Sequence, residues 1–196
     1  IGDESVLQRA LAINPNSIPA MEIYGQLLMI NGREEEAQDY FQRVLSLNPE
    51  SLKTLSALAS HAVFEERVDD YTGYLVQLDS FSPNNPIFLG NIADTLGKKY
   101  LFVEAVEYAR AAIAADPQYW QGYTLLGSNL IRLGYEDEGK TNLEIGYEND
   151  PFNVMTSNML KIFDTLENYA TLESEHFKVR MSENDADILW PYLEPL

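Results

Sequence analysis

The chain has 196 residues, no cysteine, and 31 acidic against 13 basic residues, which gives a formal net charge of −18. Without cysteine there are no disulfides and no thiolate chemistry, and the composition fits cytoplasm and periplasm equally, so the compartment stays open. Binding to phosphate backbones needs clustered Lys and Arg, so nucleic acid and anionic membranes are poor partners. No apolar run approaches the ~18 residues of a membrane span, so membrane insertion is not expected.

Five prolines recur at a constant spacing of 34 residues: Pro15, Pro49, Pro83, Pro117 and Pro151. Each follows Asn, Ser or Asp, and each pair ends an apolar, helix-like run. Proline lacks an N–H and crowds the preceding turn, so it stops one helix and lets the next begin. The pattern predicts that new helices follow the prolines, over residues 18–30, 52–64, 86–97 and 120–133.

A second break lies in the middle of the repeated unit. Gly32 and Gly134 occupy the same repeat position, and acidic residues follow both. Glycine at a helix C-terminus with acids after it suits a short turn into a second helix. Each unit is therefore predicted to be helix, turn, helix, proline. The unit that contains Tyr71 lacks this glycine and carries a large residue where a small one is expected, so it is predicted to be distorted.

A period of 34 residues with this layout resembles the tetratricopeptide repeat family. Counted from the first helix of each unit, the eighth position is always small and the seventh always apolar: Gly25, Ala59, Ala93 and Gly127, and Tyr24, Leu58, Ile92 and Leu126. The resemblance implies an all-α fold, an alpha-alpha superhelix or solenoid, with a short strand and a helix at the C-terminal end.

The repeat divides the chain into an array over residues 1–170 and a short C-terminal region. The array is predicted to hold a half repeat over 1–15, full repeats over 18–51, 52–85, 86–119 and 120–153, and a capping helix over 152–170. Residues 171–196 are predicted to begin a truncated following domain or to form an appended tail. Because the chain opens on what looks like a second helix, we expect its true N-terminus to be missing.

In this family the first helix of each unit lines a concave groove, so the resemblance implies a protein or peptide ligand there. The predicted groove residues are Gln26, Met29, Lys53, Phe64, Asn91, Lys98, Leu125, Arg132 and Asn158. A carboxylate clamp, the family's best-known variant, needs Lys and Asn converging on one anion. Glu22 stands where a clamp would place a lysine, so we do not expect a clamp.

The sequence holds no catalytic motif, and neither an enzyme activity nor a cofactor is predicted for this chain. His61 and Glu65 are four residues apart and share one face of a predicted helix. A zinc site needs three or four ligands, so this pair alone predicts no metal site. The large acidic excess is read as a solubilising surface, with recruitment of a basic partner as the alternative.

After Pro151 the repeat pattern ends. Residues 176–181 alternate in the manner of a strand, and Ser182 with Asp185 reads as a capping box that opens a helix. One short strand is not stable alone, so it is expected to pair with a second copy or with a following domain. The last ~40 residues resemble the junction of bacterial repeat proteins with a zinc metallopeptidase domain of the gluzincin type, but contain no catalytic motif.

Three functions are therefore open. The first is a non-catalytic scaffold that binds a peptide or partner protein in the groove. The second is the accessory region of a larger zinc metallopeptidase. The third is a structural module that self-associates, with the strand at 176–181 pairing edge to edge.

Overall fold

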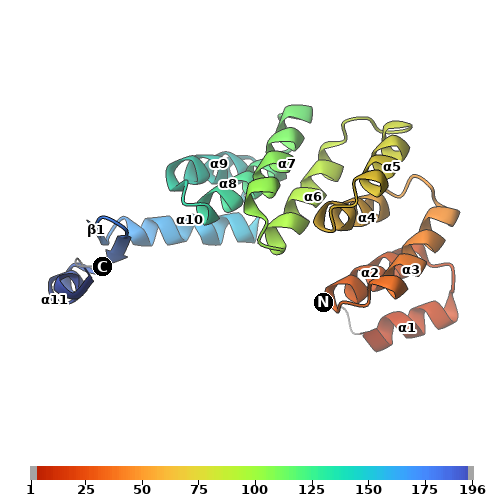
Figure 1. Cartoon of the computed structure of the whole chain (residues 1–196), viewed down its shortest axis with the longest axis horizontal. Helices are drawn as coiled ribbons and strands as arrows, with labels where there is room; N and C mark the ends of the chain where they lie inside the picture. Colours follow the sequence, from red (N-terminus) through yellow and green to blue (C-terminus); the bar gives the residue numbers. More distant parts are fainter. Residues whose placement is uncertain (1–3, 194–196) are drawn as a thin grey trace.

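The computed structural model describes residues 4–193, in which eleven helices and two short strands follow one another. The helices stack side by side into a curved array, and α10 runs from one end of it to a small hairpin (Figure 1). The elements are α1 (Glu4–Ile13), α2 (Ile18–Ile30), α3 (Glu34–Leu47), α4 (Leu52–Phe64), α5 (Val68–Asp79), α6 (Pro86–Lys98), α7 (Phe102–Ala115), α8 (Trp120–Arg132), α9 (Glu136–Asn149), α10 (Val154–Leu166), β1 (Ala170–Glu173), β2 (Lys178–Met181) and α11 (Glu183–Leu193).

Four helix pairs, α2–α3, α4–α5, α6–α7 and α8–α9, make up the body of the array. We call α2, α4, α6 and α8 the first helices, and α3, α5, α7 and α9 the second helices. The first helices begin at the residues that the proline spacing predicts. Local hydrogen bonds explain two of these starts: the side chains of Ser51 and Asn85 accept from the backbone N–H of Thr54 and Phe88, which caps α4 and α6.

All four pairs turn at the same repeat position through a residue with positive φ. These residues are Gly32, Glu66, Tyr100 and Gly134, with φ of 72°, 56°, 65° and 86°. In each turn the next residue donates its N–H back to the first helix, as from Arg33 to Leu28 at 2.9 Å and from Arg67 to Ala62 at 2.8 Å. This is the Schellman arrangement, and it forms with or without glycine.

The second pair, α4–α5, is distorted as predicted, but at the end of α5 and not at the mid-unit turn that lacks a glycine. Helix α5 has 12 residues, whereas α3, α7 and α9 have 14 each. After Asp79 the chain tightens, because Phe81 and Ser82 both donate to the Leu78 carbonyl. The mid-unit turn at Glu66 is regular, and the early end of α5 is where this pair departs from the others.

The small residues predicted at the eighth position lie where first and second helices cross. Ala59 and Ala93 are fully buried, and a Cβ added to Gly25 would lie 2.6 Å from the Phe41 ring. The buried apolar residues form three clusters along the array; the first joins α1 to the first pair through Leu7 and Tyr24. The core is thus distributed along the array, as in a solenoid, with each pair packing on its neighbours.

The C-terminal region differs from the prediction in two ways. The helix expected over 152–170 ends at Leu166, and residues 170–173 form β1, which was not expected. β1 pairs antiparallel with β2, with Ala170 opposite Met181 and Glu173 opposite Lys178. The strand at 178–181 therefore finds its partner within the chain, so it needs neither a second copy nor another domain to be paired.

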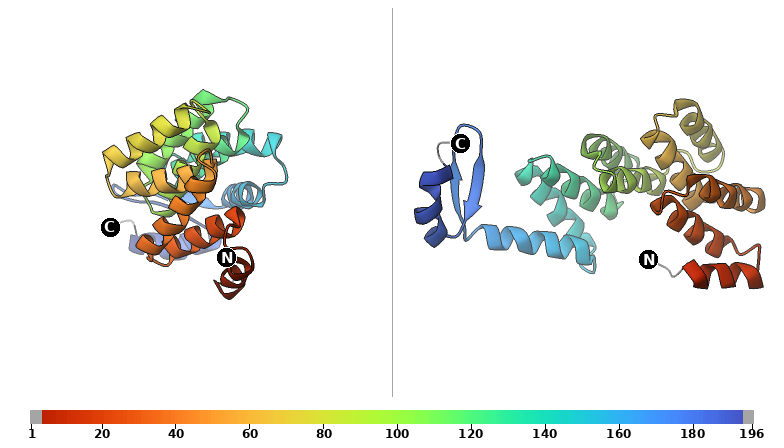
Figure 2. Two further views of the ribbon diagram at one scale, coloured as in Figure 1. Left: turned by 90° about the vertical axis from the view of Figure 1, so that its right-hand side faces the viewer. Right: turned by 60° about the horizontal axis from the view of Figure 1, so that its bottom comes forward.

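Helix α10 reaches from the last pair to the hairpin and α11, which lie beyond the array (Figure 2, right). Half of the capping box predicted at the start of α11 is present: Asp185 donates its N–H to Ser182 Oγ at 3.3 Å. The Asp185 carboxylate accepts from the Ser182 hydroxyl at 2.7 Å, where a capping box would have it accept from the Ser182 backbone N–H. α10 does not hide all of its apolar surface, since Val154 and Ile162 are 70% and 58% exposed.

Candidate functional site

Hydrogen bonds between neighbouring first helices show that their side chains adjoin one another. Glu22 on α2 accepts from the hydroxyl of Ser51, the residue that caps α4, at 2.7 Å. Asn91 on α6 donates to Ser56 on α4 at 3.2 Å. Thr124 on α8 and Thr156 on α10 share a buried hydrogen bond at 2.9 Å. The first helices and α10 thus contribute adjoining side chains along the array.

Eight of the nine predicted groove residues have exposed or half-buried side chains. We call this set the first-helix face: Gln26, Met29, Lys53, Phe64, Asn91, Lys98, Arg132 and Asn158. Leu125 does not join it, because its side chain is only 4% exposed and packs with Ala93 and Ala109 in the third core cluster. The sequence pattern placed Leu125 on the right helix but did not show how closely α8 packs on its neighbours.

The cations of the first-helix face are each held by an internal contact. Lys98 pairs with Asp94 at 2.6 Å, and Lys53 lies 3.9 Å from Glu22. Arg132 donates to the Ser128 carbonyl at 3.1 Å and lies over the Phe102 ring. These three cations lie on three different helices, α4, α6 and α8, and each already has a contact within the chain.

Two amides on this face are free to bond a ligand. Within residues 4–193, the side chains of Gln26 and Asn158 make no hydrogen bond. Asn91 uses its NH₂ group on Ser56 and keeps its carbonyl oxygen. An amide offers both a donor and an acceptor, the combination that an extended peptide backbone needs.

Charge separates the two sets of helices sharply. The first helices together hold two acidic and three basic residues, whereas the second helices hold fourteen acidic and three basic residues. The formal charge is therefore +1 on the first helices and −11 on the second. The total charge follows from the composition, but this separation emerges only when residues are assigned to helices.

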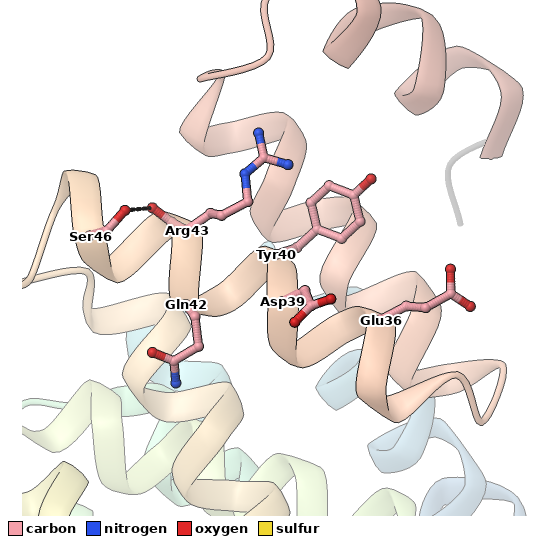
Figure 3. Close-up of a pocket in the computed structure, with 6 residues that line it drawn as sticks. All are labelled: Glu36, Asp39, Tyr40, Gln42, Arg43 and Ser46. Atoms are coloured by element: carbon pink, nitrogen blue, oxygen red, sulfur yellow. Dashed lines mark hydrogen bonds between the residues drawn. The ribbon is translucent and has the colours of Figure 1, made fainter.

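A surface hollow on α3 is a weaker candidate. Its lining residues are Glu36, Asp39, Tyr40, Gln42, Arg43 and Ser46, all from one helix (Figure 3). Arg43 is already engaged, since it donates to the Pro15 carbonyl at 2.6 Å and stacks on the Tyr40 ring. A hollow lined by a single helix offers no converging groups, so we do not assign it a ligand.

The comparisons with known proteins agree with the repeat. Residues 18–51, which span α2 and α3, match the family model described as tetratricopeptide repeat. No curated protein matches the chain. Among residues 4–193, no helix combines the length and apolar character needed to cross a membrane.

Three solved structures illustrate the likeness in fold. The first TPR of Spaghetti (RPAP3) bound to HSP90 peptide SRMEEVD is 20% identical, with a TM-score of 0.46, and covers 58% of this chain and 90% of that one. YrrB, a TPR protein with an unusual peptide-binding site, is 16% identical, with a TM-score of 0.47 and 81% coverage of both chains. PilW, a type IV pilus biogenesis factor, is 18% identical, with a TM-score of 0.48, and covers 75% and 68%.

Because these TM-scores are below 0.5, the assignment depends on the match over 18–51 and on the helix arrangement itself. The helix pair of residues 18–51 recurs at intervals of 34 residues through α4–α5, α6–α7 and α8–α9. The protein is an all-α superhelical array of repeated helix pairs, the first of which matches the tetratricopeptide repeat, with a β-hairpin and a helix at its C-terminal end.

Proposed function

We propose that this protein is a non-catalytic scaffold that binds an extended, weakly charged peptide segment of a partner protein on its first-helix face. The observation that carries the proposal is the charge separation between the helices. A net −11 on the second helices keeps the protein soluble and repels acidic surfaces, while the nearly neutral first helices can be desolvated at lower cost.

The side chains of this face suit an extended backbone. The free amides of Gln26 and Asn158 supply donors and acceptors at the two ends, and the Asn91 carbonyl oxygen supplies an acceptor between them. The half-buried Met29 and Phe64 offer apolar contacts to ligand side chains. This mixture supports main-chain recognition with a few apolar anchors.

The experiment is selection of a displayed random-peptide library against the purified protein, followed by NMR titration with the enriched peptides. We expect shifts to concentrate on amides of α2, α4, α6, α8 and α10. Asn91→Ala and Arg132→Ala should each weaken binding, whereas Gln42→Ala on α3 should not. Shifts confined to the second helices, or equal binding by all three variants, would refute the proposal.

A second candidate function is the accessory region of a larger zinc metallopeptidase. One observation favours it: β2 and α11 lie where the resemblance expects the opening strand and helix of such a domain. Reading the gene beyond residue 196 tests this directly. A His-Glu-x-x-His motif there would support it, and its absence would exclude it.

Self-association through residues 176–181 stays a prediction. The pairing of β2 with β1 already uses one edge of each strand, which weakens the physical reason for pairing between copies. Light scattering over a range of protein concentrations distinguishes a monomer from an associating species.

A further inference from the structure

Three side chains with metal-ligating groups meet between the first and second helix pairs. Glu34 is the first residue of α3, and His61 and Glu65 lie at the C-terminal end of α4. One ligand atom from each residue lies within 4.8 Å of the other two. His61 Nε2 and a carboxylate oxygen of Glu34 are 3.3 Å apart. The sequence showed only the pair on α4, and packing of the array supplies the third member.

Local structure explains why these groups point at one another. His61 and Glu65 are four residues apart, so they lie on one face of α4. Glu34 follows the turn at Gly32, whose hydrogen bond from Arg33 to Leu28 directs the chain into α3. The Arg33 side chain turns elsewhere, bonding Glu36 at 2.7 Å and Glu4 at 2.8 Å. Arg33 therefore does not pair with the Glu34 carboxylate, which lies next to His61.

We propose that Glu34, His61 and Glu65 bind one Zn²⁺ ion, with water as the fourth ligand. Zn–N and Zn–O bonds of about 2.0–2.2 Å in a tetrahedron place neighbouring ligand atoms roughly 3.3–3.5 Å apart. The separation of His61 from Glu34 already has this value. A rotation of the exposed Glu65 side chain brings its carboxylate to the same spacing, because all three ligand atoms already lie within 4.8 Å of one another.

The donor set favours zinc over the alkaline-earth ions. An imidazole nitrogen suits zinc, copper and nickel, whereas magnesium and calcium prefer oxygen ligands throughout. The His61 side chain is only 14% exposed, so the imidazole is held in place by its surroundings. Burial lowers the pKa of His61, which favours the neutral imidazole, the form that binds a metal.

Two cations near His61 would repel a bound metal ion electrostatically, and each of them already has a contact elsewhere. Arg67 and Lys99 are close enough to influence the imidazole electrostatically. Arg67 pairs with Asp70 at 3.3 Å, and Lys99 lies over the Phe64 ring. Their charges are therefore partly engaged, and the two carboxylates of the cluster balance the charge of a divalent ion.

A bound ion would link α3 to α4 and hold the angle between the first two pairs. This role is structural and is independent of the peptide-binding proposal. It predicts that zinc stabilises the folded chain, since a ligand that binds only the native state raises the unfolding temperature.

The test is calorimetric titration of the metal-free 196-residue chain with ZnCl₂ and, separately, with MgCl₂. We expect about one equivalent of zinc and no saturable magnesium binding. His61→Ala and Glu65→Gln should each lower zinc affinity at least ~10-fold. The matched controls are His176→Ala, which removes the exposed histidine of the hairpin, and Glu35→Gln, which changes a neighbouring acid outside the cluster.

Circular dichroism of each variant checks that the helices are retained, and thermal unfolding with and without zinc gives a second readout. Zinc uptake and thermal stabilisation that disappear in His61→Ala but persist in His176→Ala would establish the site. The proposal is overturned by non-saturable uptake, by uptake that survives His61→Ala, or by equal losses in the two histidine variants.

Discussion

Gly127 on α8 and Gly139 on α9 approach so closely that a Cβ added to Gly127 would lie 2.6 Å from the Gly139 carbonyl oxygen. That oxygen belongs to the backbone of a neighbouring helix, so it cannot move aside as a flexible side chain can. We expect Gly127→Ala to force the last pair apart and to destabilise the protein by about 1–3 kcal/mol. Thermal unfolding followed by circular dichroism measures the effect.

Gly73 provides the matched control for this substitution. It lies inside α5, and a Cβ added there would meet nothing within 4 Å. Gly73→Ala should therefore stabilise the protein by about 0.5–1 kcal/mol, because alanine loses less backbone freedom in a helix. Equal destabilisation by the two substitutions would show that the close approach of α8 and α9 is not what limits position 127.

The turn at Glu66 makes a second prediction. Glu66 has a φ of 56°, a conformation that costs a residue with a side chain about 1–2 kcal/mol and costs glycine almost nothing. Glu66→Gly should stabilise the protein by up to about 1 kcal/mol, after allowance for the greater freedom of glycine in the unfolded chain. Urea unfolding measures the difference.

Gly32 occupies the equivalent position in the first pair, with a φ of 72° and open space where a Cβ would lie. Gly32→Ala should destabilise by about 1–2 kcal/mol, and steric contact cannot be the cause. If Glu66→Gly and Gly32→Ala change stability in the same direction, backbone strain does not govern these turns.

Local signals explain why so much of the fold was predictable. A proline stops a helix through its own ring and missing N–H, so five prolines at equal spacing define the helix boundaries without knowledge of tertiary contacts. The first helices accordingly begin at the predicted residues. The turn at Tyr100 was less visible, because hydrogen bonds to the preceding helix impose a glycine-like conformation on a residue that does not favour it.

Features that depend on distant residues were not predictable. β1 has only four residues, and its pairing with β2 rather than its own sequence makes it a strand. The meeting of Glu34 with His61 depends on how α3 packs against α4, and no spacing rule connects residues 27 positions apart. Leu125 was assigned to the binding face because the repeat position, unlike the packing, is visible in the sequence.

The contact between Glu4 on α1 and Arg33 next to α3 predicts that acid weakens the packing of α1 against the first helix pair. Arg33 bonds the Glu4 carboxylate at 2.8 Å and Tyr24 donates to it at 2.9 Å, which lowers the pKa of Glu4 below its ordinary value. The stabilisation is fully present above the unfolded-state pKa and is lost as the pH falls through the lower, folded-state pKa. Glu4→Gln should therefore lower the thermal midpoint at pH 7, and this difference from wild type should shrink as the pH is lowered through the folded-state pKa.

Glu35→Gln is a suitable control for the loss of one negative charge, since Glu35 is an exposed acid of the first turn of α3. The two variants should differ at pH 7 and converge in acid. A difference between wild type and Glu4→Gln that stays the same from pH 7 into acid would show that the carboxylate does not act through its charge.

The buried hydrogen bond between Thr124 and Thr156 should decide how firmly α10 is attached to the array. The two hydroxyls are 2.9 Å apart, and both side chains are almost fully buried. Thr156→Val keeps the shape of the side chain but leaves the Thr124 hydroxyl without this partner, so we expect a loss of about 1–3 kcal/mol. Thr165→Val, at an exposed position of α10, should change stability much less.

The double variant Thr124→Val with Thr156→Val removes both hydroxyls, so neither is left buried without its partner. It should be more stable than Thr156→Val alone, because desolvating an unpaired hydroxyl costs more than losing the bond itself. Urea unfolding of the wild type, the two single variants and the double variant completes a double-mutant cycle. This cycle gives the coupling energy between the Thr124 and Thr156 hydroxyls. If the two losses simply add, the hydroxyls act independently and packing alone holds α10 against α8.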